Sequence, residues 1–411
     1  MGTTGAMGTR GSTGVTGAGE AGAIGSTGAI GSTGAVGSTG AIGATGLELA
    51  TAGVYEQYID NVIQILMVFT PTGATSPVGA LGSGYVINSS GDIVTCAHVI
   101  NVPDAVINEL WVTFFTDNKT YRAETVGYDN HHDVAVIRVV SGQTPLYPTV
   151  FPTWRDSRLV KIGEGCMAMG HPLGAYIQSV AKGTVIDNKS HDPTSSNSAI
   201  AITESILSDF ETAGGNSGGP IFDLNGNLIG ILAFTATGDN NYVINGGAAS
   251  HNVQRIVDYI LALTTPIPRK FPSKYLGVTY SPFSINQQRS FYPPTTSGSF
   301  RFDSYGYIVK TVLGGSPAAS ATPSPIQVND VILEYNGTKV GQNNDFLPLS
   351  TFIHFQNYDG LSTDTVQLLV LRHAGGATGS QVTQLLTVTL TPIPAAEDYP
   401  LSTTQGYEPI A

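Results

Sequence analysis

Residues 214–220 read Gly-Gly-Asn-Ser-Gly-Gly-Pro, the stretch of the chain that says most about its fold. A serine between glycines is typical of a tight turn that presents a nucleophile, because small neighbours let a carbonyl carbon approach the Ser217 hydroxyl. Gly215, Asn216 and Ser217 would form an oxyanion hole, in which the N–H groups of Gly215 and Ser217 converge on one point. A glycine-rich loop without chemistry has the same composition, so this interpretation needs a base and an acid elsewhere in the chain.

Both partners are found upstream. His98 follows the strand-like run at 93–95, which places it at a strand end. Asp133 opens the apolar run at 134–137, where its carboxylate would be buried against His98. Such a carboxylate holds the imidazole in the tautomer that accepts the Ser217 proton, and it stabilises the resulting imidazolium. Taken singly, a histidine is more often a surface or core residue, and an aspartate before a strand is often a turn residue.

The order His98, Asp133, Ser217 along the chain is that of the chymotrypsin clan. From roughly residue 78 to residue 393 the sequence resembles the HtrA family of trypsin-like serine proteases. Other motifs that carry the resemblance are Gly82-Ser83-Gly84, Asp156-Ser157 and Met169-Gly170-His171-Pro172-Leu173-Gly174. The resemblance implies a serine endopeptidase that acts on protein or unfolded-polypeptide substrates, uses no cofactor and no metal, and forms a homotrimer.

The resemblance also implies a mainly β fold, with two six-stranded antiparallel β-barrels of the chymotrypsin type followed by a PDZ-like α/β domain. Strand-like runs separated by turn residues extend from Val62 to Ala249, and the segment 251–263 has apolar residues at helical spacing. The expected domains are a collagen-like Gly-X-Y repeat at 1–46, a linker at 47–60, the protease domain at 61–263, a Pro-rich linker at 264–272, the PDZ-like domain at 273–393 and a C-terminal tail at 394–411.

Four residues are expected to line the specificity pocket: Glu211, Ile231, Leu232 and Ala233. Glu211 lies six residues before Ser217, near the base of the primary pocket in this clan. An inward Glu211 would favour Lys or Arg before the scissile bond, whereas an outward one leaves an apolar pocket for small aliphatic residues. The outward arrangement is favoured, because a lone buried carboxylate is costly.

Asn216 bears on regulation. In digestive members of the clan an aspartate at this position receives a buried ammonium released by propeptide cleavage, and Asn216 has no charge to offer. The resemblance implies instead that loops around the site shift between ordered and disordered forms, with candidates at 187–197, 209–215 and 235–247. The chain has Ala213-Gly214 where the family usually has Asn-Pro, so the turn depends more on its surroundings.

The first 46 residues differ from the rest, because glycine recurs at every third position with one slip at Gly17-Ala18-Gly19. Only glycine fits the axis of three wound polyproline-II chains, so a collagen-like triple helix is the first interpretation. The segment contains no proline, which would preorganise such chains. Another glycine-repeat packing and a flexible low-complexity tail therefore stay open. A trimeric protease would clamp the three strands together and offset their weak propensity.

Residues Tyr275, Leu276, Gly277 and Val278 resemble the carboxylate-binding loop of a PDZ domain. In such a domain the backbone N–H groups of this loop hold a peptide's C-terminal carboxylate, and the peptide adds a strand to the sheet edge. A PDZ-like domain that only packs against the protease is the alternative. Asn329 in place of the usual glycine and a long insertion at 281–304 make peptide binding less secure than the fold.

Composition narrows the classes of partner. The 411 residues carry a formal net charge of −12 with only 18 Lys and Arg, which argues against nucleic-acid binding. Cys96 and Cys166 lie in strand-like segments, where buried free thiols are favoured over a disulfide. His131 and His132 have no further ligands at metal spacing, so a solvated turn is expected there.

The sequence shows no secretion signal and no membrane span, and the compartment is left open. A collagen-like segment on a protease suits a cell surface, the extracellular space or a particle surface. Two binding functions rival the enzyme: a non-proteolytic chaperone or scaffold that uses its PDZ-like domain, and a surface fibre with the protease fold as a trimeric head. An intact triad argues against both.

Overall fold

The structure is a computed structural model that describes residues 44–102, 105–130, 132–190, 204–237, 243–271, 274–283, 306–341, 349, 353, 364–374, 380–392 and 408–409. It begins with helix α1 (Ala44–Tyr58) and the short 3-10 turn η2 (Ile59–Asn61). The segment expected as a linker is therefore largely helical, as are the last three residues of the glycine repeat. Residues 1–43, which hold the rest of that repeat, lie outside the described residues. The chain divides into two compact units after Glu56, the second of which contains the barrels.

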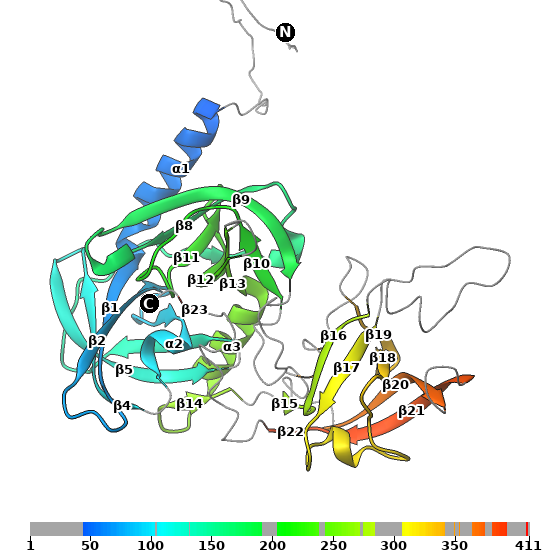
Figure 1. Ribbon diagram of the computed structural model, residues 1–411. Coiled ribbons are helices and arrows are strands. Elements are labelled where there is room, and N and C mark those ends of the chain that lie inside the picture. The colour runs from blue at the N-terminus through cyan, green and yellow to red at the C-terminus, as the bar shows by residue number, and fades with distance from the viewer. Residues whose placement is uncertain are drawn as a thin grey trace, which may run out of the picture. The chain divides into compact units, whose positions relative to one another are not determined.

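The first barrel is a closed antiparallel sheet, drawn in blue to cyan in Figure 1. The neighbours run β5-β4-β1-β2-β3-β6, and β5 also pairs with β6, which closes the ring. Ile63, Ile65 and Met67 alternate along β1 and are all buried, because closure turns one face of each strand inward. The strands are β1 (Val62–Pro71), β2 (Val78–Val86), β3 (Ile93–Thr95), β4 (Ala105–Phe114), β5 (Lys119–Asp129) and β6 (Val134–Val139).

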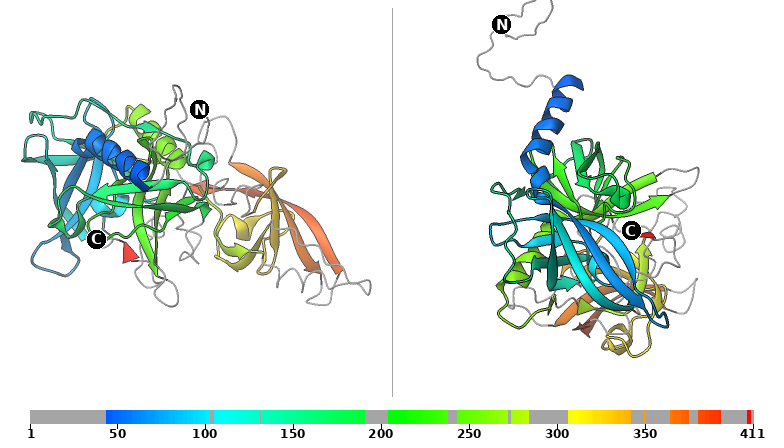
Figure 2. Two further views of the ribbon diagram at one scale, coloured as in Figure 1. Left: turned by 90° about the horizontal axis from the view of Figure 1, so that it is seen from above. Right: turned by 90° about the vertical axis from the view of Figure 1, so that its left-hand side faces the viewer.

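The second barrel, in green, follows the same plan (Figures 1 and 2). Its order is β11-β8-β9-β10-β13-β12, and a β11–β12 pairing closes it, which confirms the predicted pair of six-stranded barrels. Two short strands are added to β12: β7 (Thr153–Trp154) in parallel and β23 (Glu408–Pro409) in antiparallel. The barrel strands are β8 (Gly165–Gly170), β9 (Ser179–Ser190), β10 (Ser205–Ser208), β11 (Pro220–Asp223), β12 (Asn227–Thr237) and β13 (Val243–Ala249), with 3-10 turns η3 (Ser157–Leu159) and η4 (Pro172–Gly174).

Helix α3 (Ser250–Ala262) confirms the helix predicted at 251–263, and its apolar stripe of Val253, Ile256, Val257 and Ile260 is buried. The helix contacts β5 and β6 of the first barrel as well as β12 and β13 of the second. Beyond it, β14 (Arg269–Lys270) pairs in parallel with β5. The segment 264–272, expected as a semi-rigid linker, thus adds a strand to the first barrel instead of running free.

The C-terminal part contains a further antiparallel sheet in the order β16-β17-β18-β20-β21, with β19 beside β18, and a separate pair β15-β22. Val309, Ile332 and Leu368 belong to its buried core. Among the described residues, no helix is both long enough and apolar enough to span a bilayer. The elements are β15 (Lys274–Tyr275), β16 (Val278–Pro282), β17 (Tyr307–Val312), η6 (Ala318–Ser320), β18 (Val331–Tyr335), β19 (Thr338–Lys339), β20 (Thr365–Ala374), β21 (Ser380–Thr389) and β22 (Thr391–Pro392).

Candidate active site

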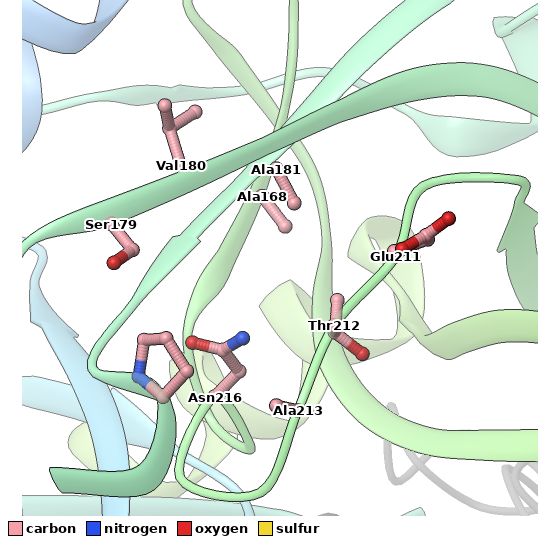
Figure 3. A pocket seen from close by; sticks show the side chains of 9 residues that line it. Ala168, Ser179, Val180, Ala181, Glu211, Thr212, Ala213 and Asn216 are labelled. Carbon is pink, nitrogen blue, oxygen red and sulfur yellow. The ribbon is translucent and has the colours of Figure 1, made fainter. Parts of the chain in front are cut away.

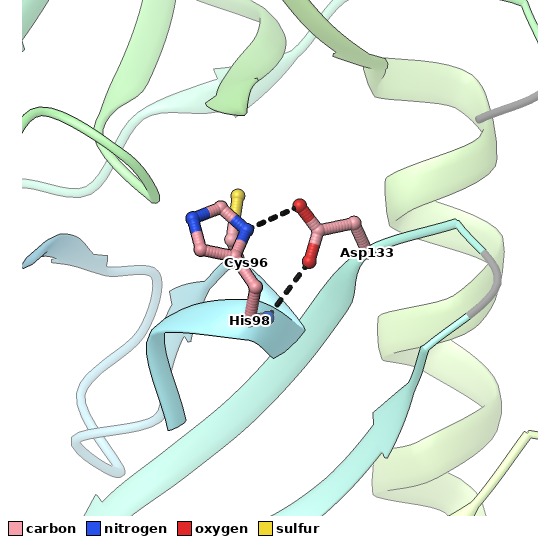
Figure 4. A group of neighbouring side chains, drawn as sticks. All are labelled: Cys96, His98 and Asp133. Carbon is pink, nitrogen blue, oxygen red and sulfur yellow. Dashed lines mark hydrogen bonds and ion pairs between the residues drawn. The ribbon is translucent and has the colours of Figure 1, made fainter. Parts of the chain in front are cut away.

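His98 and Asp133 meet at one end of the first barrel. His98 lies in α2 (Ala97–Ile100), the single turn that follows β3, and Asp133 directly precedes β6. Nδ1 of His98 is 2.7 Å from Oδ2 of Asp133, and the backbone N–H of His98 donates to Oδ1 at 2.8 Å (Figure 4). Because an ionised carboxylate only accepts hydrogen bonds, Nδ1 carries the proton and Nε2 is left as the acceptor.

This pair is fixed by its surroundings. The side chains of His98 and Asp133 are 7% and 2% exposed, and Nε2 of His98 has no hydrogen-bond partner among the described residues. Asp133 has a φ of 57°, in the left-handed region that aspartate tolerates better than most residues. Its two bonds to His98 hold it in this conformation. The arrangement therefore presents one basic ring nitrogen in a single orientation.

The thiol of Cys96 links the histidine segment to the second barrel. Its Sγ donates to the carbonyl oxygen of Leu232 at 3.2 Å, and the same oxygen accepts from the N–H of Gly218 at 2.7 Å. Gly218 is the residue after the serine. One carbonyl thus joins the segment that carries His98 to the turn that carries the expected nucleophile.

Cys96, His98 and Asp133 each offer a potential metal-ligand atom, and these atoms lie within 4.8 Å of one another. Burial raises the pKa of the Cys96 thiol well above its ordinary value, so the sulfur stays protonated. Metal ions bind the thiolate, and Nδ1 of His98 is already used by Asp133. The donor set therefore fits a hydrogen-bonded His–Asp pair better than a metal site.

Ser217 lies on the turn before β11, fully buried by the residues around it. Its carbonyl oxygen accepts from the backbone N–H of Ser83 in β2 at 2.7 Å. A Cβ added to Gly82 would lie 3.3 Å from that carbonyl and 2.5 Å from a methyl group of Val99. Since Val99 follows His98, Gly82 lies close to both the histidine helix and the serine turn.

The turn before Ser217 is held from two sides. The N–H of Leu173, in η4, donates to the carbonyl oxygen of Gly214. The hydroxyl of Ser83 donates to the carbonyl oxygen of Gly215 at 2.7 Å and accepts from the N–H of His171 at 3.0 Å. In a trans peptide the C=O and the following N–H point in opposite directions. The Gly214–Leu173 bond therefore turns the N–H of Gly215 away from Leu173.

His171 supports this turn from behind. It is fully buried, stacks on Phe115 with ring centroids 4.8 Å apart, and accepts at Nδ1 from the backbone N–H of Gln178 at 3.1 Å. Burial lowers the pKa of His171 from 6.5 to about 4, so the ring is neutral at physiological pH. In the sequence analysis His171 was noted only as part of a family motif. The one local signal for its role is its place before Pro172, in a short segment bounded by Gly170 and Gly174.

A cavity of about 260 Å³ lies next to the turn (Figure 3). The side chain of Asn216 points into it toward Ala168 and Ala181, and its buried Oδ1 has no hydrogen-bond partner among the residues that the structure describes. Glu211 is exposed at the rim and its carboxylate points away from Asn216, whereas its part in specificity stays a prediction. The lining residues are Ala168, Pro172, Ser179, Val180, Ala181, Glu211, Thr212, Ala213 and Asn216.

The other three expected pocket residues do not lie around this cavity. Ile231, Leu232 and Ala233 are fully buried, and Leu232 packs in the core of the second barrel. They do not line this cavity, and the apolar wall expected from this run stays a prediction. Leu232 packs in the barrel core, β13 covers one edge of this part of β12, and α3 contacts the strand, whereas the pairing with β11 ends at Ile231. An apolar run on such a strand is used for the core.

His132 is also corrected. It is fully buried and its Nδ1 contacts the carboxylate of Asp129, whereas a solvated turn was expected. His131 lies outside the described residues. Cys96 and Cys166 are buried and free, as predicted.

The expected carboxylate loop is partly described. Tyr275 and Leu276 are buried, Gly277 has a φ of 81°, and the carbonyl of Gly277 accepts from the N–H of Leu313 at 2.9 Å. β16 begins at Val278 and lies at one edge of its sheet. Asn329 has a φ of 73°, which explains why glycine is usual at that position and why asparagine can replace it.

Several predictions fall outside the described residues. These are the triple helix at 1–43, residues 191–197 and 238–242 of the loops expected to change order, and residues 284–304 of the long insertion.

Comparison with known proteins agrees with the two barrels. Residues 82–231 match the family described as the trypsin-like peptidase domain. The chain is 30% identical over 261 residues to a "Probable periplasmic serine endoprotease DegP-like" of Chlamydia trachomatis, covering 63% of this chain and 46% of that protein. It is 28% identical over 317 residues to "Protease Do-like 1, chloroplastic" of Arabidopsis thaliana, covering 72% of this chain and 65% of that protein.

The chain spans about half the length of the DegP-like relatives it matches. Among solved structures, HtrA-type protease AlgW with a tripeptide is similar at a TM-score of 0.58 and 22% identity, covering 84% of this chain and 97% of that one. The serine endoprotease from Yersinia pestis is similar at a TM-score of 0.51 and 20% identity, covering 84% and 98%. At these identities the structures support the fold. Residues 82–231 thus resemble a trypsin-like peptidase domain, and the fold resembles that of HtrA-type proteases.

Proposed function

We propose that the protein is a serine endopeptidase in which Ser217 is the nucleophile, His98 the general base and Asp133 the residue that orients His98. The observation that carries the proposal is the double contact between Asp133 and His98, at 2.7 Å and 2.8 Å. It leaves Nε2 as a proton acceptor next to a glycine-rich serine turn. The trypsin-like family match and the DegP-like relatives support the same activity.

In the proposed reaction the Ser217 oxygen attacks the carbonyl carbon of the scissile bond while its proton passes to Nε2 of His98. The N–H groups of Gly215 and Ser217 stabilise the oxyanion, and Asp133 stabilises the imidazolium. His98 then gives the proton to the leaving amine, and an acyl-enzyme remains on Ser217. A water molecule activated by His98 releases the acid product and restores the serine.

A fluorophosphonate probe tests this proposal, because it labels only an activated serine. We expect covalent labelling of the full chain and cleavage of an unfolded protein such as casein, with both lost in Ser217→Ala. Labelling that persists in Ser217→Ala, or that is absent from the folded wild-type chain, would contradict the proposal. Binding of casein without cleavage would point to the chaperone alternative.

We also propose that residues 273–393 form a PDZ-like domain that binds peptide C-termini at Tyr275, Leu276, Gly277 and Val278. The edge position of β16 and the positive φ of Gly277 support it. Fluorescence anisotropy with a labelled decapeptide checks this. A free carboxylate should bind at least about tenfold more tightly than the same peptide amidated, since the amide carries no charge. Equal binding of both peptides would exclude carboxylate capture.

A homotrimer outside the cytoplasm is the assembly and location we propose. The printed names of several relatives place those proteins in the periplasm, and the glycine repeat needs three chains to form a triple helix. Analytical ultracentrifugation of the full chain and of a chain lacking residues 1–46 checks the assembly. We expect trimers of both, whereas the isolated peptide 1–46 should show no triple-helix signal by circular dichroism at room temperature. A monomeric shortened chain would make the repeat the source of assembly.

A further inference from the structure

The side-chain amide of Asn216 is buried, yet it makes no hydrogen bond. The residue is 7% exposed, and neither end of its amide is bonded to any residue that the structure describes. A Cβ added to Gly170 would lie 2.4 Å from Oδ1, so the glycine makes room for the amide. Burying an amide without a partner costs free energy. A group that bonds this amide from the cavity would remove that cost.

The other polar side chains around the cavity already make hydrogen bonds elsewhere (Figure 3). The hydroxyl of Thr212 donates to Oδ1 of Asn245 at 2.8 Å, and that of Ser179 donates to the carbonyl oxygen of Tyr176 at 3.3 Å. Apart from Glu211 at the rim, the remaining lining is apolar and consists of Ala168, Pro172, Val180, Ala181 and Ala213. A ligand in the cavity would therefore meet small apolar walls and one amide whose donor and acceptor are both unused.

The charge around the cavity favours a neutral ligand. Glu211 is the only ionisable residue among the described lining residues, and its carboxylate points away from Asn216. An ammonium group would enter without an anion beside it, and a carboxylate would enter without a cation in a chain of net charge −12. A neutral amide avoids both costs, and it offers a donor for Oδ1 and an acceptor for Nδ2.

The size of the cavity sets the rest of the ligand. Its volume of about 260 Å³ is several times the roughly 30 Å³ that one water molecule occupies. An apolar chain of about four carbons would bury its surface against the alanines and Val180.

The cavity adjoins the proposed reacting groups without including them. His98, Asp133 and Ser217 do not line it, so a ligand there need not touch the substrate. Asn216 nevertheless lies between Gly215 and Ser217, whose N–H groups form the proposed oxyanion hole. The N–H of Asn216 donates to Ala213 at 3.3 Å, which is longer than usual. A ligand that holds the side chain of Asn216 would therefore restrict the backbone that carries both N–H groups.

We propose that this cavity is a binding site for a neutral amide on a short apolar chain, and that its occupation orders the serine turn and activates the enzyme. The binding step depends on the buried amide and the cavity alone, whereas the activation rests on the proposed protease activity. A free small amide and the side chain of a glutamine in a polypeptide share this chemistry.

Binding is measured by isothermal titration of the full chain carrying Ser217→Ala. Butyramide should bind with a dissociation constant of about 1–10 mM, which is ordinary for a ligand of about six non-hydrogen atoms. N,N-dimethylbutyramide lacks the donor and n-butylammonium lacks the acceptor, so both should bind at least about tenfold more weakly. Equal binding of all three, or no binding of butyramide, would overturn the site. N-acetylglutamine methylamide is titrated in parallel: tighter binding than butyramide assigns the site to polypeptide, and weaker binding assigns it to a free amide.

Two variants locate the site. Ala181→Leu fills the cavity and should abolish butyramide binding, whereas Ala175→Leu, exposed and outside the lining, is the matched control and should keep it. Asn216→Asp keeps the shape of the side chain but only accepts hydrogen bonds, so it should bind n-butylammonium in place of butyramide. Melting curves verify folding, and Asn216→Asp decides if Ala181→Leu does not fold. Unchanged butyramide binding in either folded variant would overturn the site.

Activation is measured with Ser217 intact. Saturating butyramide should raise the rate of fluorophosphonate labelling about fivefold in the wild type and in Ala175→Leu, and it should leave Ala181→Leu unchanged. N,N-dimethylbutyramide at the same concentration should have no effect. Unchanged or slower labelling of a chain that binds butyramide would overturn the activation. Binding of butyramide without labelling of any chain would instead overturn the protease and leave the amide site standing.

Discussion

The two barrels contribute to the site in different ways. The first barrel supplies a His98–Asp133 pair that fixes itself through two mutual hydrogen bonds. The second barrel supplies a serine turn made largely of glycine, which other segments hold in place through Ser83 and Leu173. Changes to the pair should therefore alter proton transfer directly. Substitutions around the turn should alter activity indirectly, by changing the position of the turn backbone. The size of the loss should depend on which atoms the substituted residue contacts.

The largest effect is expected in the pair. Asp133→Asn should lower kcat about 10⁴-fold at neutral pH, because an amide can donate to Nδ1 and stabilise the wrong tautomer of His98. Asp129→Asn is the matched control, since Asp129 also contacts a buried histidine, His132. It should lower the melting temperature and leave the labelling rate of the folded protein within about twofold. Comparable losses of activity in both variants would show that burial of the carboxylate, and not its contact with His98, is what matters.

In the turn, Gly215→Ala should lower kcat/KM by about 10²- to 10³-fold by disturbing the oxyanion hole. Gly215 has a φ of 95°, and an added Cβ would lie 2.6 Å from the carbonyl oxygen of His171. Gly163 has a φ of 93° with nothing within 4 Å, so Gly163→Ala carries the same backbone strain without the collision. The control should cost about 1 kcal/mol of stability and little activity. Fluorophosphonate labelling of both folded variants measures the contrast; equal rates would contradict it.

Acid should lower the free energy of unfolding by protonating the buried His171 ring next to the serine turn. The pKa of His171 falls from 6.5 to about 4 on folding, so the unfolded chain binds this proton more tightly. The contribution of the neutral ring is therefore complete above pH 6.5 and is lost as the pH falls toward 4, by about 3 kcal/mol in total. Urea unfolding at several pH values, with His171→Gln for comparison, measures it. The stability difference between wild type and variant should shrink between pH 6.5 and 4; a constant difference would exclude His171 as the source.

A smaller effect is expected at Ser83, whose hydroxyl joins Gly215 to His171. Ser83→Ala should lower the labelling rate about tenfold and the free energy of unfolding by about 1–3 kcal/mol. Ser250→Ala also removes a buried hydroxyl, one that donates to the carbonyl of Arg155. That control should lose similar stability with an unchanged labelling rate. If both variants label alike, the hydroxyl of Ser83 is structural only.

The smallest effect is expected at Glu211, which is exposed and points away from Asn216. Glu211→Gln should change the preference for residues before the scissile bond less than about twofold, because water screens the charge. Cleavage of a peptide library by both chains checks this. A strong loss of Lys and Arg substrates in Glu211→Gln would show that the carboxylate turns inward when substrate binds.

Much of the candidate site could be predicted because each of its residues has a recognisable sequence environment. Ser217 is marked by its glycines, and His98 and Asp133 are marked by their places beside apolar strands. The order of the three residues then indicates the barrel pair. The barrel pair was expected from the resemblance that this order and the other motifs carry, whereas α3 and the buried thiols were expected from patterns among neighbours in the sequence; all three agree with the structure.

The remaining features depend on distant residues. Ser83 is 132 positions from Gly215, and no local pattern reveals that its hydroxyl holds the turn. The apolar run Ile231–Ala233 is the same whether a strand lines a pocket or a core, and only closure of the barrel decides. His132 and Asp129 are three positions apart and were within reach of prediction. A two-residue strand that contains a proline, such as β23, gives no strand signal at all.

The return of the chain to the first barrel has a consequence for self-digestion. α3 rests on strands of both barrels, and β14 is bonded to β5 although it follows the second barrel in the sequence. A single peptide-bond cleavage in the connection between the barrels, at residues 140–152, would therefore leave two fragments that these contacts hold together. We expect the two fragments of the cleaved chain to elute together in size-exclusion chromatography and to keep the candidate active site assembled. A denaturant that disrupts the contacts of α3 and β14 should separate them.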